Sequence, residues 1–282
     1  MSVRMIQDRL ADYDCRSRRE EELALHEITQ EIVLAALGRG DLYRRAGFQG
    51  GTCLRVFHGT HRFSEDLDFA LEVPDAAFDL LPYLLAISKE AAAYGFDLEI
   101  DDRPKAGRAV RMAFLKDDSI GRLLHLTYRP SRGPSRKLRV KLEVDANPPA
   151  GATFETKLLD FPFPSAIRVF DLPSLFAGKL HALLCREYQK GRDWYDFVWY
   201  TARAVRPNYD LLASALHQHG PWRKKRISID RGWTRDHLQH RIEATDWERA
   251  REDVRRFVEP GELPSLELWG REFFTAQLDK LG

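Results

Sequence analysis

Two aspartates separated by one apolar residue, Asp66 and Asp68, stand in a stretch where Leu67 and Phe69 alternate with them. On a β-strand, alternate side chains project from the same face, so this spacing predicts two neighbouring carboxylates above two core residues. Such carboxylates repel each other unless a cation lies between them. Mg²⁺ suits them, because it binds one or two carboxylates and completes its shell with substrate phosphates. A solvated acidic strand is the alternative.

Gly50, Gly51 and Thr52 precede these aspartates and open a short predicted helix. Glycines let backbone N–H groups approach a phosphate closely, and the N-terminus of a helix favours an anion. The three residues therefore predict a nucleotide-phosphate site, with an ordinary turn as the alternative.

A third acid is available from the predicted strand 139–145. Val140, Leu142 and Val144 share one face of this strand, which leaves Lys141, Glu143 and Asp145 on the other. If this strand pairs beside the first, Asp145 or Glu143 completes the metal site. A half-exposed amphipathic strand explains the same pattern.

A predicted helix that runs from Leu172 to Gln189 carries Lys179 and Arg186 outside its apolar face. A lysine in a cleft provides a compact charge for a triphosphate, and an arginine can bind phosphate oxygens with its fork of N–H groups. A solvated helix face is the alternative.

Two basic clusters depart from the balanced charge of the chain and predict a surface that binds RNA. The first lies at 129–141 and includes Arg136 and Lys137; the second includes Arg223 and Lys224 and follows Trp222. Solvated charge runs remain the alternative for both.

The glycines, the short helix and the D-x-D strand together resemble the DNA polymerase β-like nucleotidyltransferase superfamily. The longer string Gly50-Gly51-Thr52…Arg62-Phe63-Ser64-Glu65-Asp66-Leu67-Asp68-Phe69 resembles, more narrowly, the AbiEii/AbiGii-type toxins of bacterial type IV toxin–antitoxin systems, including the mycobacterial MenT-like enzymes. The resemblance extends from about Glu20 to at least Tyr200.

The resemblance implies roles for particular side chains. Asp66 and Asp68 would be catalytic metal ligands, and Lys179 would bind the nucleotide phosphates. Asp193 would position or deprotonate the acceptor hydroxyl, with Asp196 as the alternate. Ser64 looks like the serine that some antitoxins phosphorylate, although its hydroxyl could equally bind a nucleotide phosphate.

The resemblance also implies the reaction, which is transfer of NMP from an NTP to an acceptor hydroxyl with Mg²⁺ as cofactor and release of pyrophosphate. The expected acceptor is the 3′ end of tRNA, the expected nucleotide is CTP or GTP, and a cognate antitoxin is the expected protein partner. One rival is a Mg²⁺ nuclease built on Asp145, Glu155 and Lys157. Another is a noncatalytic module that binds RNA or protein.

The elements that must position these residues are a predicted helix over 20–37, the acidic strand, a helix over 76–94 and further strands that include 123–128. A helical lobe follows from residue 172 onward, so the predicted class is α+β. We expect two lobes: a nucleotidyltransferase lobe over 1–150 with a mixed sheet, and a mainly helical lobe over 151–282. The proline-rich segment from Ala146 to Pro164 is expected to link them.

The 44 Lys and Arg against 43 Asp and Glu give a net charge of +1, which excludes a uniformly basic nucleic-acid coat. Three scattered cysteines exclude a disulfide framework and a thiolate zinc cluster. No apolar stretch approaches the length of a membrane span, and the N-terminus lacks the apolar core of a signal peptide. We therefore expect a soluble cytoplasmic protein.

Overall fold

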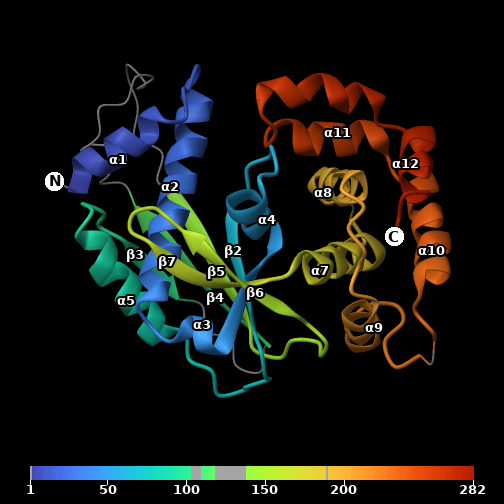
Figure 1. Ribbon diagram of the computed structural model, residues 1–282, viewed down its shortest axis with the longest axis horizontal. Helices are drawn as coiled ribbons and strands as arrows, with labels where there is room; N and C mark the ends of the chain where they lie inside the picture. Colours follow the sequence, from blue (N-terminus) through green and yellow to red (C-terminus); the bar gives the residue numbers. More distant parts are fainter. Residues whose placement is uncertain (1, 103–108, 118–137, 189, 226) are drawn as a thin grey trace. The chain divides into compact units, whose positions relative to one another are not determined.

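The computed structural model describes residues 2–102, 109–117, 138–188, 190–225 and 227–282 (Figure 1). The chain divides into two compact units, each built from several segments. Unit 1 comprises Met1–Thr52, Ser64–Asn147 and Thr156–Val169, and unit 2 comprises Cys53–Phe63, Pro148–Glu155 and Phe170–Gly282. The predicted lobe boundary at residue 150 stays a prediction.

In the described part of the chain, seven strands form one mixed sheet in the order β3-β4-β5-β2-β1-β7-β6. The strands are β1 (Ala46–Gln49), β2 (Asp66–Leu71), β3 (Glu99–Asp102), β4 (Val110–Asp117), β5 (Leu138–Asp145), β6 (Phe154–Leu159) and β7 (Ser165–Phe170). The acidic strand β2 lies in the middle of the sheet, antiparallel to β1 and parallel to β5. With the helices described next, this sheet confirms the predicted α+β class.

Helices of unit 1 pack beside the sheet (Figure 1). Those that contact its strands are α2 (Arg18–Gly38), α3 (Leu42–Arg45) and α5 (Leu81–Ala92), and α1 (Ser2–Ala11) packs against α2. The Ser17 hydroxyl caps α2 by accepting a hydrogen bond from the Glu20 N–H, as Ser does at helix N-termini. Apolar side chains of α1, α2 and α5 meet in one cluster that includes Ile6, Leu10, Ile28, Ile32 and Ala91. Helix α4 (Gly50–His58) begins in unit 1 and ends in unit 2.

Unit 2 is mainly helical. Its helices are α7 (Leu172–Cys185), α8 (Gly191–Ala202), α9 (Tyr209–Gln218), α10 (Arg231–Glu243), α11 (Trp247–Arg255), the 3₁₀ helix η1 (Pro260–Leu268) and α12 (Arg271–Leu278). Trp194 of α8 is fully buried and lies 5.2 Å from Trp247 and 5.1 Å from Phe274, measured between ring centroids. These rings join α8, α11 and α12 in one aromatic core.

The segment expected to link the two lobes contributes a strand that the sequence did not predict. It contains β6, and β7 follows it directly. Its prolines all lie outside the two strands, where they cost no ladder hydrogen bond. The role of the segment as a linker stays a prediction.

The helix expected from Ala76 begins only at Leu81. Side-chain carboxylates delay it, because Asp75 accepts a hydrogen bond from the Ala77 N–H and Asp79 accepts one from the Leu81 N–H. Helix α7 ends at Cys185, earlier than expected. Helix α1 was not predicted, and the predicted strand 123–128 lies outside the described residues. None of the described helices combines the length and the apolar character that crossing a membrane requires.

Candidate active site

The predicted acidic strand is confirmed as β2, and its side chains alternate as expected. Leu67 and Phe69 are buried, whereas Asp66 and Asp68 are half-buried on the opposite face. Because alternate residues of a strand share a face, the two carboxylates lie side by side within unit 1.

The glycines upstream let the chain pass close to these carboxylates. Gly50 has φ +80°, and a Cβ atom there would lie 2.4 Å from Asp68 Oδ2. A side chain there would displace the Asp68 carboxylate, and the positive φ favours glycine, so glycine meets both the backbone and the packing requirement. The Thr52 hydroxyl donates a hydrogen bond of 2.5 Å to the backbone oxygen of Asp66. The first turn of α4, which also contains Gly51, is therefore held against β2.

The neighbouring strand β5 adds charged side chains to the same face. Asp66 pairs with Lys141, Asp68 with Glu143, and Ala70 with Asp145. Residues paired in this way project to the same side of a sheet. Of the two acids left open by the sequence, Glu143 lies directly opposite Asp68. Asp145 lies one pair further on, and its Oδ1 atom accepts a hydrogen bond from the Asn147 N–H.

Lys141 is the cation of β5 that pairs directly with the acidic strand β2. Its Nζ atom lies 2.8 Å from Glu143 Oε2, and both side chains are 27% exposed. Burial by itself lowers the pKa of Lys141, but Glu143, Asp66 and Asp68 outweigh it and raise that pKa above its ordinary value. The ammonium thus lies within the electrostatic reach of three carboxylates.

The carboxylates of this sheet face suit a metal cation that needs few protein ligands. Among the described residues, no three His, Cys, Asp or Glu side chains converge as a metal-ligand group. Mg²⁺ does not need such a cage, since it takes one or two carboxylates and fills its shell with water and phosphate oxygens. Asp66 and Asp68 on one face of β2 fit that requirement, and a third ligand from Asp145 stays a prediction.

Ser64 lies just before β2 and is half-buried. Its backbone oxygen accepts a hydrogen bond of 3.1 Å from Gln30 Nε2 of α2. The predicted nucleotide-binding or regulatory serine is thus tied through its backbone to the helix that supports the sheet.

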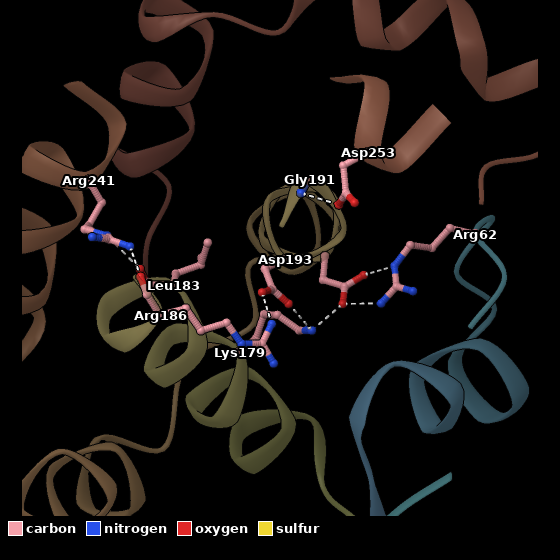
Figure 2. Close-up of polar contacts among 9 residues, drawn as sticks. Arg62, Lys179, Leu183, Arg186, Gly191, Asp193, Arg241 and Asp253 are labelled. Carbon is pink, nitrogen blue, oxygen red and sulfur yellow. Dashed lines mark hydrogen bonds and ion pairs between the residues drawn. The ribbon is translucent and has the colours of Figure 1, made fainter. Parts of the chain in front are cut away.

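The second group of predicted residues forms a buried ion-pair network in unit 2 (Figure 2). Lys179 Nζ on α7 lies 2.9 Å from Asp193 Oδ1 and 2.8 Å from Asp196 Oδ2, both on α8. The Lys179 side chain is only 14% exposed. The lysine and both candidate aspartates, which the sequence left as alternatives, therefore meet at one point.

Arg62 completes the network. Its guanidinium donates two hydrogen bonds of 2.5 Å to the two oxygens of Asp196, and the arginine and aspartate side chains are 2% and 0% exposed. Arg186, which is 44% exposed, contacts Asp193 at the other end of the network (Figure 2). Both oxygens of Asp196 are thus held by buried cations, whereas Asp193 is held partly by a cation that reaches solvent.

These cations determine the charge of the two acids. Burial alone raises the pKa of Asp196, but Arg62 and Lys179 outweigh it and hold that pKa below its ordinary value. The pKa of Asp193 is lowered against burial in the same way by Lys179 and Arg186. Both carboxyl groups are therefore ionised at neutral pH.

Close helix packing keeps the network in place. A Cβ atom on Gly191 would lie 1.8 Å from the Ala250 backbone oxygen, so glycine is required where α8 meets α11. The Gly191 N–H also donates a hydrogen bond of 2.9 Å to Asp253 Oδ2. Arg241 of α10 donates to the backbone oxygens of Leu183 and Arg186 at the end of α7 (Figure 2).

The predicted RNA-binding residues fall into two sets. Arg223 and Lys224 are exposed in the turn that follows α9. Trp222 beside them packs edge-on against Trp233, with 5.1 Å between ring centroids. Arg136 and Lys137 lie outside the described residues.

Sequence reasoning assigned no role to Arg62, and it placed Lys141 on the polar face of the strand 139–145 without giving it a role at the site. Arg62 lies 134 residues from Asp196, and no local pattern reports such a contact. The alternation in 139–145 placed Lys141 on the acidic face, and this signal would have identified it once the pairing of β5 with β2 was known.

A family model described as the nucleotidyl transferase AbiEii toxin of type IV toxin–antitoxin systems matches residues 32–275, which is most of the chain. The chain belongs to the AbiEii family. As an AbiEii-family protein it is a nucleotidyltransferase enzyme and a toxin of a type IV toxin–antitoxin system, which implies an antitoxin partner.

One solved structure supports the fold. This AbiEii-family chain is similar to MenT4, a nucleotidyltransferase toxin from Mycobacterium tuberculosis H37Rv. The identity is 18% and the TM-score 0.55, with 100% of this chain and 91% of that chain covered. JHP933 from Helicobacter pylori matches at 17% identity and a TM-score of 0.48, with 92% of this chain and 89% of that chain covered. No curated protein matches the chain.

Proposed function

We propose that this enzyme transfers NMP from an NTP to the 3′ end of tRNA in a Mg²⁺-dependent reaction that releases pyrophosphate and blocks translation. The observation that supports the metal-dependent step is the pair Asp66 and Asp68 on one face of β2, with Asp68 packed where Gly50 has no side chain. CTP or GTP is the favoured nucleotide. We place the reaction in the cytoplasm, where tRNA and NTPs occur together.

Asp66 and Asp68 would hold Mg²⁺, and the backbone N–H groups at Gly50 and Gly51, with Thr52, would bind the phosphates that accompany it. The bound metal would supply electrostatic stabilisation for the attacking and leaving oxygens of an in-line displacement. The short contact between Thr52 and the Asp66 backbone keeps the phosphate-binding turn at the carboxylates.

Asp193 is the better candidate for the acid that orients the acceptor hydroxyl. Asp196 has both oxygens held by buried cations, so none is available to a substrate. Asp193 needs only the half-exposed Arg186 to move in order to free an oxygen. Lys179 would bind phosphate oxygens with the ammonium that contacts Asp193 and Asp196, and Asp196 would serve to position it.

The tRNA acceptor is supported by the exposed cations Arg223 and Lys224. Such side chains bind backbone phosphates without reading sequence. Arg136 and Lys137, the other predicted RNA-binding residues, would also bind backbone phosphates.

Ser64 is the proposed site of regulation. A phosphoryl group there would add about two negative charges just before Asp66, and these charges would repel the triphosphate. The antitoxin partner would then inhibit the enzyme by adding negative charge at the residue two positions before β2.

The sheet order does not favour the nuclease alternative. Asp145 lies on β5 and Lys157 on β6, with β2, β1 and β7 between them. Four strand spacings separate the two residues by about 19 Å, too far for one metal site.

One assay separates the three candidate functions. The protein is incubated with each α-labelled NTP, Mg²⁺ and total tRNA, and the RNA is resolved on a denaturing gel. Label in intact tRNA is the expected result. Shortened tRNA would support the nuclease, and unlabelled, intact tRNA that the protein nevertheless binds would support the noncatalytic module.

A further inference from the structure

Four charged side chains of one sheet face form a single electrostatic cluster in unit 1. Asp66 and Asp68 on β2 lie opposite Lys141 and Glu143 on β5, residue for residue. Like charges that face each other on neighbouring strands repel, and Asp68 and Glu143 are such a pair. The cluster needs a positive charge in the absence of a metal.

Lys141 supplies that charge from within the cluster. It is the strand partner of Asp66 and an ion-pair partner of Glu143, at 2.8 Å. Its ammonium has three donors and no acceptor, so it can serve several carboxylates but cannot bind a metal. A lysine in this place therefore stabilises the same carboxylates that a divalent cation would stabilise, and it repels that cation.

We propose that Lys141 is the resident counter-cation of the carboxylate site and weakens the binding of free Mg²⁺. This inference rests on the proposed function, since it takes Asp66 and Asp68 as the metal-binding acids. Its consequence is selectivity. Bare Mg²⁺ meets the opposing charge of Lys141, whereas Mg²⁺ bound to a triphosphate arrives as a net anion and is attracted by it. Lys141 thus favours a metal that enters together with its nucleotide.

The expected size of the effect follows from Coulomb's law. A unit charge and a divalent cation about 6 Å apart in a water-like dielectric interact by an energy equivalent to roughly tenfold in affinity. Removing the charge of Lys141 should therefore tighten the binding of Mg²⁺ alone roughly tenfold.

The test uses thermal unfolding of the full chain in a titration of MgCl₂ without nucleotide, at constant ionic strength. Lys141→Met is compared with the wild type and with Lys116→Met. Lys116 is a matched control, because it lies on β4 of the same sheet, is 24% exposed and forms an ion pair of 3.0 Å with Asp101. Lys141→Gln is a second variant in case the methionine variant does not fold.

We expect the Mg²⁺ concentration at half of the stabilisation to fall roughly tenfold in Lys141→Met, while Lys116→Met keeps the wild-type value. Metal-free Lys141→Met should also unfold at a lower temperature than the metal-free wild type. Asp68→Asn should lose the stabilisation by Mg²⁺.

Two results would overturn the inference in distinguishable ways. If Asp68→Asn loses the stabilisation but Lys141→Met and Lys141→Gln keep the wild-type midpoint, the metal site stands and the role of Lys141 is wrong. If Mg²⁺ does not stabilise even the wild type, the metal site of the proposed function fails, and the inference fails with it.

Discussion

At the scale of single residues, unit 2 contains a buried ion pair between Arg62 and Asp196. Both side chains are almost fully buried and are joined by two hydrogen bonds of 2.5 Å. A buried ion pair contributes little net stability, because desolvation offsets the attraction, but breaking it leaves an uncompensated charge. We infer that its role is to hold Lys179 in one position through Asp196.

Arg62→Met should therefore lower the free energy of unfolding by about 3–5 kcal/mol, since it leaves Asp196 buried with Lys179 as its remaining partner. Chemical denaturation with a circular dichroism signal measures this change. The double variant Arg62→Met/Asp196→Leu removes both charges, and it should recover most of the stability without recovering nucleotidyl transfer. A double variant that regains full transfer would show that the pair has no positioning role.

The network also predicts a response to acid. The pKa values of Asp193 and Asp196 are depressed in the folded protein, relative to about 3.9 for an unperturbed Asp. Their contribution to stability is therefore complete above pH of about 4 and is lost as the pH falls through the folded pKa values. The melting temperature should fall below that pH, and by less in Arg62→Met/Asp196→Leu, which lacks one of the acids. Equal slopes in wild type and double variant would contradict this assignment.

At the scale of elements, the sequence predicted the strands and helices whose apolar residues recur at a regular spacing. Alternation in 66–71 and 139–145 predicted β2 and β5, and helical spacing predicted α2 and the helices that follow residue 172. The pairing between strands was not predictable, because it depends on contacts between segments far apart in the chain. Strand β6 was missed because it is a short edge strand whose prolines flank it and resemble a linker.

The residues of the candidate site also divide into those that the sequence could predict and those that it could not. The paired carboxylates could be predicted because both lie on one strand, within one repeat of its alternation. Lys141 joins them only through the register of β5 on β2, and Arg62 reaches Asp196 only through the tertiary fold. Local pattern thus predicted the acids and Lys179, while Lys141 and Arg62 needed the structure.

The turn from β1 into α4 gives a prediction at this scale. Gly50→Ala should abolish nucleotidyl transfer and reduce stability, because the new methyl group would displace the Asp68 carboxylate. Gly59→Ala is the matched control, since Gly59 also has a positive φ, of +70°, but has no atom within 4 Å of its Cβ position. The control should lose only about 1–2 kcal/mol from backbone strain and keep its activity. Equal loss of transfer in both variants would mean that the approach to Asp68 is unimportant.

At the scale of the whole molecule, the near-neutral charge means that any RNA surface must be local. Arg223→Gln/Lys224→Gln should weaken binding of tRNA and reduce the slope of log K against log salt concentration by about 1–2, because each phosphate contact releases counterions. Arg271→Gln/Lys280→Gln, at two exposed positions of the C-terminal segment, is the matched control for net charge. Filter binding over a salt series measures both slopes. If the two double variants lose affinity equally, the effect comes from net charge and not from this turn.

The central claim is that Asp66 and Asp68 hold the metal on which nucleotidyl transfer depends. Its most direct measurement is incorporation of α-labelled nucleotide into tRNA by Asp68→Asn, compared with Asp8→Asn, which alters an exposed acid of α1. Both variants should keep their fold by circular dichroism. We predict that Asp8→Asn labels tRNA like the wild type and that Asp68→Asn loses labelling by at least about a hundredfold, the scale on which a single electrostatic group contributes to catalysis. Wild-type labelling by a folded Asp68→Asn would contradict the account.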